Sequence, residues 1–239
     1  MCGITGFINF DSPNSIEREL DNAIKSLLHR GPDSAGKQIF SNGFHIGFGH
    51  RRLSILDTSN AGHQPMLSHS GRYVICFNGE IYNHLELRSF IFKEFSFDKW
   101  NSSSDTETLL NLISFVGVKQ ALKMLEGMFA FVLYDQQEKK IFLARDRAGE
   151  KPLYFSSANK ALLFGSELKA LRCFSKHDDT ISTTALNAYT QLNYIPAPYS
   201  IYQGTFKCPQ GALISIDLRS FDYSSTANNF DQFTSLNGV

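Results

Sequence analysis

The sequence predicts an α+β fold in which two antiparallel β-sheets are stacked and helices pack on their outer faces. Short apolar segments with alternating polarity recur along the chain, as expected for strands of antiparallel sheets. Longer stretches interrupt them with apolar residues every three or four positions, the spacing of helices that cover one face of a sheet. With 239 residues, 42% of them hydrophobic, the chain is long enough to bury such a core.

The predicted strands are short and follow one another along most of the chain. In order they are CGITGFINF (2–10), FHIGFGH (44–50), RYVICFN (72–78), MFAFVLYD (128–135), KIFLARD (140–146), PLYFSS (152–157), ALLFGSE (161–167) and GALISID (211–217). Cys76 lies inside the third strand and is expected to be a buried small hydrophobic residue.

The first predicted helix covers residues 15–29. Asn14 and Glu17 have the spacing of a capping box at its start, and Gly31 is expected to end it. Its large apolar residues fall on one face: Ile16, Leu20, Ile24, Leu27 and Leu28.

A second, longer helix is predicted over residues 105–126. It opens with Ser104 and Glu107, again at capping-box spacing, and carries a run of apolar residues. Weaker helical patterns cover residues 84–94 and 184–193.

The overall charge excludes several classes of partner. Lysine plus arginine equal aspartate plus glutamate at 23 each, so no field of one sign is available to attract nucleic acid or a membrane surface. No apolar run approaches the roughly 20 residues that span a bilayer, and the N-terminus lacks the features of a signal peptide. We therefore expect a cytoplasmic protein.

Metal-binding patterns are missing from the sequence as well. The four cysteines form no CxxC pair, and the seven histidines show no HxH or HExxH spacing. His50, His63 and His84 are expected to be structural, and we predict no metal site and no cofactor in this chain.

Cys2 has a position that chemistry can exploit. A small residue after the initiator methionine generally permits removal of Met1, which would leave Cys2 with a free α-amino group. The α-amine titrates near ~7.7 to 8.0 and a thiol near ~8.5, so the neutral amine can take the thiol proton at physiological pH. Nucleophile and base would then belong to one residue. Many chains begin Met-Cys without catalysis, so this signal needs support.

The supporting residues have ordinary interpretations when taken singly. Asn78 and Gly79 are a common hairpin-turn pair. Arg52 resembles an ordinary surface arginine, and Asp105 at the start of a helix favours the helix dipole.

Together, the same residues match the groups of free glutamine. Arg52 can pair with the α-carboxylate, and Asp105, with Glu80, can hold the α-ammonium. Asn78 and Gly79 can stabilise the oxyanion that forms when a nucleophile attacks the side-chain amide.

Nine segments occur in an order and spacing that resemble one known family: MCGITGF, LLHRGPD, RRLSILD, AGHQPM, FNGEIYNH, SDTETLL, LEGMFAFVLYD, ARDRAGEKPLYF and FGSELKAL, followed by a YIPAP connector. The chain looks like the N-terminal glutaminase domain of glutamine-hydrolysing asparagine synthetases, a class II glutamine amidotransferase. The resemblance covers nearly all of residues 1–220. It implies the N-terminal-nucleophile hydrolase fold, a four-layer α/β/β/α sandwich.

The resemblance also implies site residues, carried over motif by motif. Cys2 would be the nucleophile, with Asn78 and Gly79 as the oxyanion hole. The glutamine-binding residues would be Arg52, Leu53, Ser54, Ile55, Leu56, Asn78, Gly79, Glu80 and Asp105.

Two regions are expected. Residues 1–180 would form the amidotransferase domain, and residues 181–239 would be a connector toward an ATP-dependent synthetase domain. No SGGxDS-type phosphate-binding loop occurs, so the sequence resembles a truncated product more than a complete ligase, and ATP and Mg²⁺ are expected for the missing domain alone. The last twenty residues are polar and expected to be loosely ordered.

The implied activity is hydrolysis of glutamine to glutamate and ammonia, with the ammonia passed to a synthetase domain, in cis or in trans, that makes asparagine from aspartate and ATP. One alternative sends the ammonia to a sugar or cell-envelope precursor. Another is a non-catalytic regulatory module. Expected partners are glutamine and the synthetase domain, with a homodimer as a candidate assembly and no nucleic acid or membrane.

Overall fold

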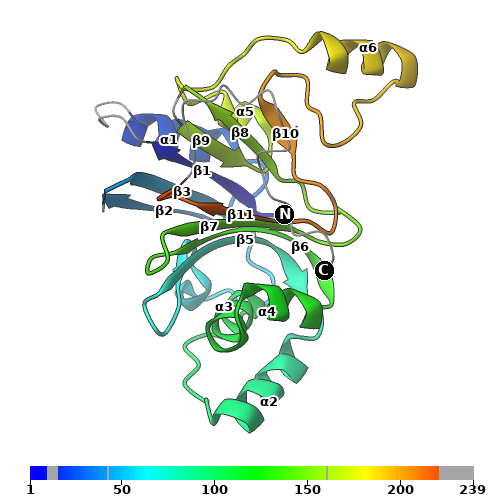
Figure 1. Ribbon diagram of the computed structural model, residues 1–239. Helices are drawn as coiled ribbons and strands as arrows, with labels where there is room; N and C mark the ends of the chain where they lie inside the picture. Colours follow the sequence, from blue (N-terminus) through cyan, green and yellow to red (C-terminus); the bar gives the residue numbers. More distant parts are fainter. Residues whose placement is uncertain (10–15, 42, 160, 221–239) are drawn as a thin grey trace.

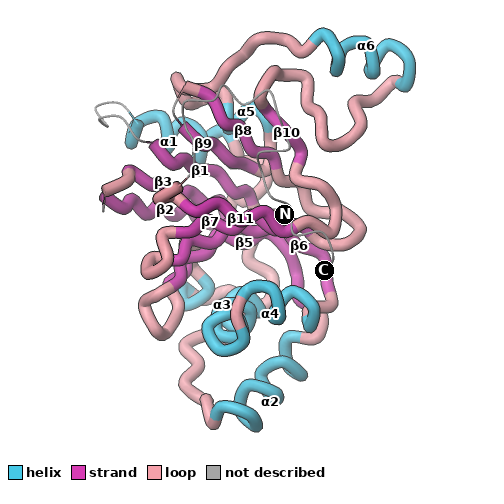
Figure 2. Tube along the Cα trace, viewed as in Figure 1, coloured by secondary structure: helices cyan, strands magenta, loops and turns pink. Residues whose placement is uncertain are grey.

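A computed structural model describes residues 1–9, 16–41, 43–159 and 161–220. Two antiparallel sheets lie face to face between helices, which confirms the predicted α+β sandwich (Figures 1 and 2). The six-stranded sheet has the order β10 (Thr205–Lys207), β8 (Tyr154–Ala158), β9 (Ala161–Gly165), β1 (Gly3–Asn9), β3 (His45–Arg52), β2 (Ser34–Ser41). The five-stranded sheet has the order β11 (Leu213–Asp217), β7 (Lys140–Arg145), β6 (Gly127–Asp135), β5 (Tyr73–Ile81), β4 (Met66–Leu67).

The helices divide between the two outer faces. Helices α1 (Ile16–Ser26) and α5 (Leu168–Leu171) pack on the six-stranded sheet (Figure 1). Helices α3 (Asp105–Val116) and α4 (Val118–Met124) cover the five-stranded sheet, and α2 (His84–Phe95) packs against α3 (Figure 1). A short 3₁₀ helix, η1 (Asn60–Gly62), precedes β4. At the end of an extended connection, α6 (Thr183–Leu192) lies apart from the sandwich (Figure 1).

Three apolar clusters hold the four layers together. The central cluster lies between the sheets and includes Ile4 and Phe48 from one sheet and Cys76 and Val132 from the other. A second cluster joins the five-stranded sheet to α2, α3 and α4, and a third joins the other sheet to α1 and α5. Cys76 is fully buried, as predicted.

Glycine divides the long helix predicted over residues 105–126. Gly117 adopts a φ of 80°, which favours glycine, and its N–H still donates to the carbonyl of Ile113 over 2.9 Å. The prediction of one helix was therefore wrong, since α3 ends before Gly117 and α4 begins after it. At the start of α3, Ser104 Oγ accepts the N–H of Glu107 as predicted. The Glu107 carboxylate, however, accepts N–H groups of the preceding loop rather than closing the box.

The end of α1 also differs from the prediction. The α-helix ends at Ser26, and the chain continues in a tighter turn in which the N–H of Arg30 donates to the carbonyl of Leu27 over 2.9 Å. Leu28 is therefore half exposed rather than on the buried face. The predicted cap at Asn14 lies outside the described residues.

Three strands were not predicted. β2 is an edge strand whose side chains are mostly exposed or partly buried, so its sequence shows no clear alternation. β4 has two residues and β10 has three, too short for a periodic signal. Beyond residue 180, in the predicted connector, β10 pairs with β8 and β11 pairs with β7, so this segment contributes a strand to each sheet.

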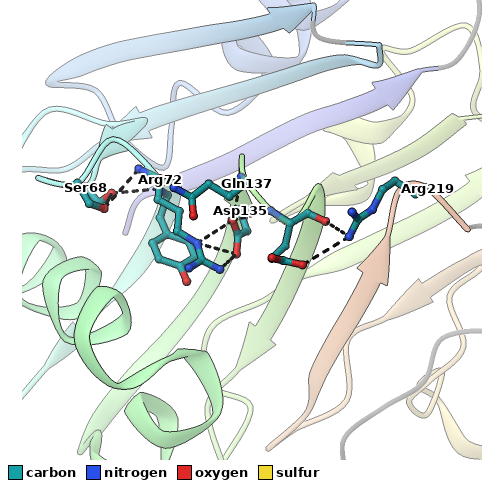
Figure 3. A network of polar contacts seen from close by, with 8 residues as sticks. Ser68, Arg72, Asp135, Gln137 and Arg219 are labelled. Atoms are coloured by element: carbon teal, nitrogen blue, oxygen red, sulfur yellow. Dashed lines mark hydrogen bonds and ion pairs between the residues drawn. The ribbon is translucent and has the colours of Figure 1, made fainter.

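A polar network fastens the end of the five-stranded sheet where β5 begins (Figure 3). Arg72 donates to both carboxylate oxygens of Asp135, with its Nη2 2.6 Å from Oδ2. The same carboxylate accepts the N–H of Gln137, and Arg219, just after β11, donates to the carbonyl of Glu138. These contacts join the turn before β5, the end of β6 and the segment after β11, so we assign the network a structural role.

Within the described part of the chain, no helix combines the length and the apolar composition needed to cross a membrane.

Candidate active site

A cavity of about 280 Å³ opens where the core between the two sheets ends. Its walls contain every site residue predicted from the sequence except Ser54. They are Cys2, Arg52, Leu53, Ile55, Leu56, Asn78, Gly79, Glu80 and Asp105, joined by Met1, Asp57, Gly62, Gln64, Phe77, Ser104, Thr106, Met128 and Lys151. Ser54 lies outside this lining, and its N–H donates to Asp33 Oδ2 over 2.8 Å.

Strand alternation explains why these residues meet. In β1, Ile4 and Ile8 face the core between the sheets, so the same period directs Cys2 to that side. In β3 the same face carries Phe48 and, four residues later, Arg52. In β5 it carries Cys76 and next Asn78. The cavity is thus the polar end of the layer that forms the central core.

Cys2 immediately precedes β1 and lies against the backbone of the β3–β4 loop. Its Sγ accepts the N–H of Leu53 at 3.4 Å and lies 3.7 Å from the carbonyl oxygen of the same residue. Burial raises the pKa of the Cys2 thiol, and the Leu53 N–H and the charge of Arg52 oppose this effect. The thiol is therefore mostly protonated at neutral pH and needs a base before it can attack.

Arg30 holds the backbone of Cys2, a role that the sequence analysis missed. Its Nε donates to the Cys2 carbonyl over 2.9 Å, and its Nη1 donates to Glu167 Oε1 over 3.0 Å. Glu167 also contacts His29 and Lys169. Partial burial opposes ionisation of Glu167, yet the hydrogen bonds from these three side chains lower its pKa to about 2. The LLHRGPD segment, quoted above for the family resemblance, contains Arg30 and was the available signal.

The guanidinium of Arg52 is held by loop backbone. It donates to the carbonyl of Ser59 over 2.7 Å and to that of Asp57. Gly62 permits this packing, because a β-carbon there would lie 2.2 Å from an Arg52 nitrogen. Hydrogen bonds, first from the Ser59 hydroxyl and then from Ser103, lower the pKa of Asp57 to about 2. The loop thereby fixes one cation at the cavity wall.

Asn78 and Gly79 lie inside β5, so the hairpin turn that was their default interpretation is wrong. They pair with Ala130 and Phe129 of β6. A β-carbon at Gly79 would approach the Met128 carbonyl to 2.3 Å, which explains the glycine. The Nδ2 of Asn78 is buried and has no hydrogen-bond partner among the described residues. A buried donor without a partner costs free energy, so Asn78 Nδ2 is a candidate to donate a hydrogen bond to a ligand oxygen.

The outer edge of β5 is open where it borders the cavity. β4 covers this edge no further than Ile75, within the residues that the structure describes. The N–H groups of Phe77 and Ile81 point to this edge, where they donate to side chains of Gln64 and Asp105. Since N–H direction alternates along a strand, the N–H of Gly79 points to the same edge.

Asp105 is the first residue of α3. Its Oδ2 accepts the N–H of Ile81 and its Oδ1 accepts the N–H of Thr106, both over 2.9 Å. Burial raises the pKa of this carboxyl, and the two backbone hydrogen bonds oppose the shift. A cationic ligand group would offset the burial of this charge.

Lys151 is a further cavity residue that the sequence analysis left without a role. It is buried and follows a loop fixed by Asp146, whose Oδ2 accepts the N–H of Lys151 over 3.1 Å. In the described ranges, no three His, Cys, Asp or Glu side chains gather in a way that could hold a metal ion.

Comparisons with known proteins agree with this architecture. The Asparagine synthetase [glutamine-hydrolyzing] 1 of Bacillus subtilis is 37% identical over 221 residues, which cover 90% of this chain and 33% of that protein. A Gibberella zeae protein named Amidase chry2 is 36% identical over 185 residues, 73% of this chain and 27% of its own length. The chain spans less than half the length of the curated relatives it matches.

A solved structure shares the fold. It is a glutamine phosphoribosylpyrophosphate amidotransferase from B. subtilis, with a TM-score of 0.62 and 19% identity, covering 91% of this chain and 48% of that one. The model of one protein family, the glutamine amidotransferase domain, matches residues 1–226. Together with the sandwich fold and the relatives above, this match shows that the chain belongs to the glutamine amidotransferase domain family.

Proposed function

We propose that this chain hydrolyses the side-chain amide of free glutamine, with Cys2 as nucleophile. In the longer protein to which such a domain belongs, the ammonia would pass to a synthetase domain that makes asparagine from aspartate and ATP. The single observation that carries the proposal is the orphaned Nδ2 of Asn78, in the wall of the cavity that also contains Cys2.

The proposed reaction has two steps. The thiolate of Cys2 attacks the amide carbon of glutamine, and the oxyanion is held by Asn78 Nδ2 and the Gly79 N–H. Collapse of this intermediate breaks the C–N bond, and ammonia leaves with a proton from the base that had received the thiol proton. Water then attacks the thioester, which yields glutamate and restores the thiol. The sum is glutamine plus water to glutamate plus ammonia.

The charges at the cavity wall fit the other end of glutamine. Arg52 offers a fixed guanidinium for the α-carboxylate, and Asp105 offers a buried carboxylate for the α-ammonium. Both partners are charged, so each would offset the burial of the other.

Removal of Met1 would serve this chemistry in two ways. It would free the α-amine of Cys2, which can accept the thiol proton without a histidine. It would also enlarge the cavity, because Met1 is part of the wall. The neighbouring histidine at position 50 is a poor base, since burial lowers its pKa to about 4.

The fate of the ammonia is inferred from relatives. A relative named as a glutamine-hydrolysing asparagine synthetase is about three times as long as the matched region, which supports a further domain in the parent protein. We propose that ATP and Mg²⁺ belong to that domain and that the glutaminase needs no cofactor.

A second acceptor class has its own support. The Gibberella zeae relative is named an amidase, not an asparagine synthetase, although its identity to this chain is similar. The same glutaminase could therefore supply ammonia to another acceptor. A non-catalytic module fits less well, because the charged and polar groups that glutamine would need all line one cavity.

Ammonia and glutamate release from glutamine tests the proposal. Intact mass should show that the active chain has lost Met1. Cys2→Ala should abolish hydrolysis with an unchanged thermal unfolding temperature. Cys173→Ala should leave hydrolysis intact, because Cys173 is not part of the cavity wall. Hydrolysis at the wild-type rate by Cys2→Ala, or by a chain that retains Met1, would refute the mechanism.

A further inference from the structure

The backbone of Phe77, the residue before Asn78, is held on both of its peptide groups by two side chains at the open edge of β5. The N–H of Phe77 donates to Gln64 Oε1 over 2.6 Å. The carbonyl of Phe77 lies 3.0 Å from His50 Nε2. A carbonyl only accepts, so Nε2 carries the proton and donates. Both side chains are buried, at 5% exposure for Gln64 and 1% for His50.

These contacts replace a neighbouring strand. Within the described residues, β4 pairs with β5 no further than Ile75. Without Gln64 and His50, the N–H and the carbonyl of Phe77 would therefore have no partner from a neighbouring strand. Gln64 comes from the loop before β4, while His50 reaches across from β3 in the other sheet. The carbonyl of Phe77 belongs to the same peptide plane as the nitrogen of Asn78, so fixing it fixes where the Asn78 side chain begins.

Gln64 also connects two parts of the cavity. Its Nε2 donates to Thr106 Oγ1 over 3.3 Å, and Thr106 in turn donates its N–H to Asp105 Oδ1. One amide side chain thus spans from the strand of Asn78 to the first turn of α3.

We propose that Gln64 and His50 are positioning residues of the oxyanion hole, holding the backbone N–H and the carbonyl of Phe77 so that Asn78 Nδ2 and the Gly79 N–H converge on one oxygen. This inference rests on the proposed glutaminase function. Neither side chain takes part in proton transfer or contacts the α-carboxylate. Their loss therefore weakens stabilisation of the transition state and leaves ground-state binding of the amino-acid end unchanged.

The test compares kcat, KM for glutamine and Ki for the product glutamate in four variants of the whole chain. Gln64→Met and His50→Leu remove the hydrogen bonds, and kcat should fall about 10- to 100-fold, because a displacement near 1 Å can cost ~10²-fold. KM and the glutamate Ki should stay within about twofold, because Arg52 and Asp105 are untouched. His50→Gln keeps a donor near the position of Nε2 and should restore most of kcat.

Gln136→Met is the matched control, since Gln136 donates to the carbonyl of Gly71 at the far end of the same sheet. It should behave as wild type. An unchanged kcat in Gln64→Met, or equal losses in His50→Gln and His50→Leu, would overturn the inference while the proposed function stands. If His50→Leu does not fold, Gln64→Met decides alone. A wild-type chain that releases no ammonia would overturn the proposed function and this inference with it.

Discussion

The backbone N–H of Leu53 points at Cys2 Sγ across 3.4 Å and joins the candidate nucleophile to the loop that follows Arg52. The contact favours negative charge on sulfur, whereas burial of the thiol disfavours it. The Leu53 N–H therefore stabilises the thiolate once it has formed, whereas burial keeps the thiol protonated until a base accepts its proton. Position and protonation of Cys2 are thus set by separate features.

Asn78→Ala should reduce turnover with little effect on binding. Removal of one oxyanion donor typically costs about 10²- to 10³-fold in kcat. The fold should tolerate the change, because Nδ2 makes no hydrogen bond within the described residues that would be lost. Steady-state kinetics and thermal unfolding check both points. An unaltered kcat would remove Asn78 from the oxyanion hole.

Arg52→Ala and Asp105→Ala should chiefly raise KM. Their proposed contacts with the α-carboxylate and α-ammonium exist in the ground state and the transition state alike, so kcat depends on them less. A suitable control is Arg72→Ala, because Arg72 forms its ion pair with Asp135 away from the cavity (Figure 3). If KM were unchanged in the Arg52 variant, the α-carboxylate would have to bind elsewhere.

Glu167 should make the fold sensitive to acid. Its pKa is lowered to about 2, so its contribution to stability is present above the unfolded-state pKa near ~4.3 and is lost as pH falls through the folded-state value. The unfolding free energy of wild type minus that of Glu167→Gln should thus be largest above about pH 4.5 and vanish toward pH 2. Denaturant unfolding at several pH values measures it. A difference that grows on acidification would have the wrong sign.

The same substitution should reach the active site through Arg30. Without the carboxylate, Arg30 loses the ion pair that aims its Nε at the Cys2 carbonyl. A lower kcat for Glu167→Gln at pH 7.5 is expected, and Glu138→Gln, which alters an exposed ion pair with Arg219, should have no effect.

The chain by itself should be a glutaminase and no more. Incubated with glutamine, ATP, Mg²⁺ and aspartate, it should release glutamate and ammonia without asparagine, because no glycine-rich segment of the sequence offers a cradle for nucleotide phosphates. Amino-acid analysis of the reaction measures this. Asparagine formed by a preparation free of other synthetases would mean that the second active site has been misjudged.

Sequence periodicity accounts for much of the fold. The strands at the centres of the two sheets stand out as short, almost continuous apolar segments, because one of their faces meets the central core and the other meets the helices. Edge strand β2 and two-residue β4 carry no such signal. The break at Gly117 was visible as a glycine, but whether a glycine ends a helix depends on its φ, which the surrounding packing decides.

The candidate site was predictable to a different extent. Cys2, Arg52 and Asn78 share the core-facing side of three strands, a relationship that period-two counting from buried residues could have found. Arg30 and Gln64 act on backbone groups of residues far away in the sequence, at positions that only the assembled sheets define. Local patterns carry no information about such contacts.

The most direct test of the central claim is alkylation by diazo-oxo-norleucine, a glutamine analogue that reacts with the nucleophile that would attack the amide. Peptide mapping by mass spectrometry should find the adduct on Cys2 alone, with loss of ammonia release in proportion to labelling, and excess glutamine should protect. Cys76 and Cys208 are buried and Cys173 lies outside the cavity, so they should stay unmodified. An adduct on any of these three, or full activity in a chain labelled at Cys2, would contradict the account.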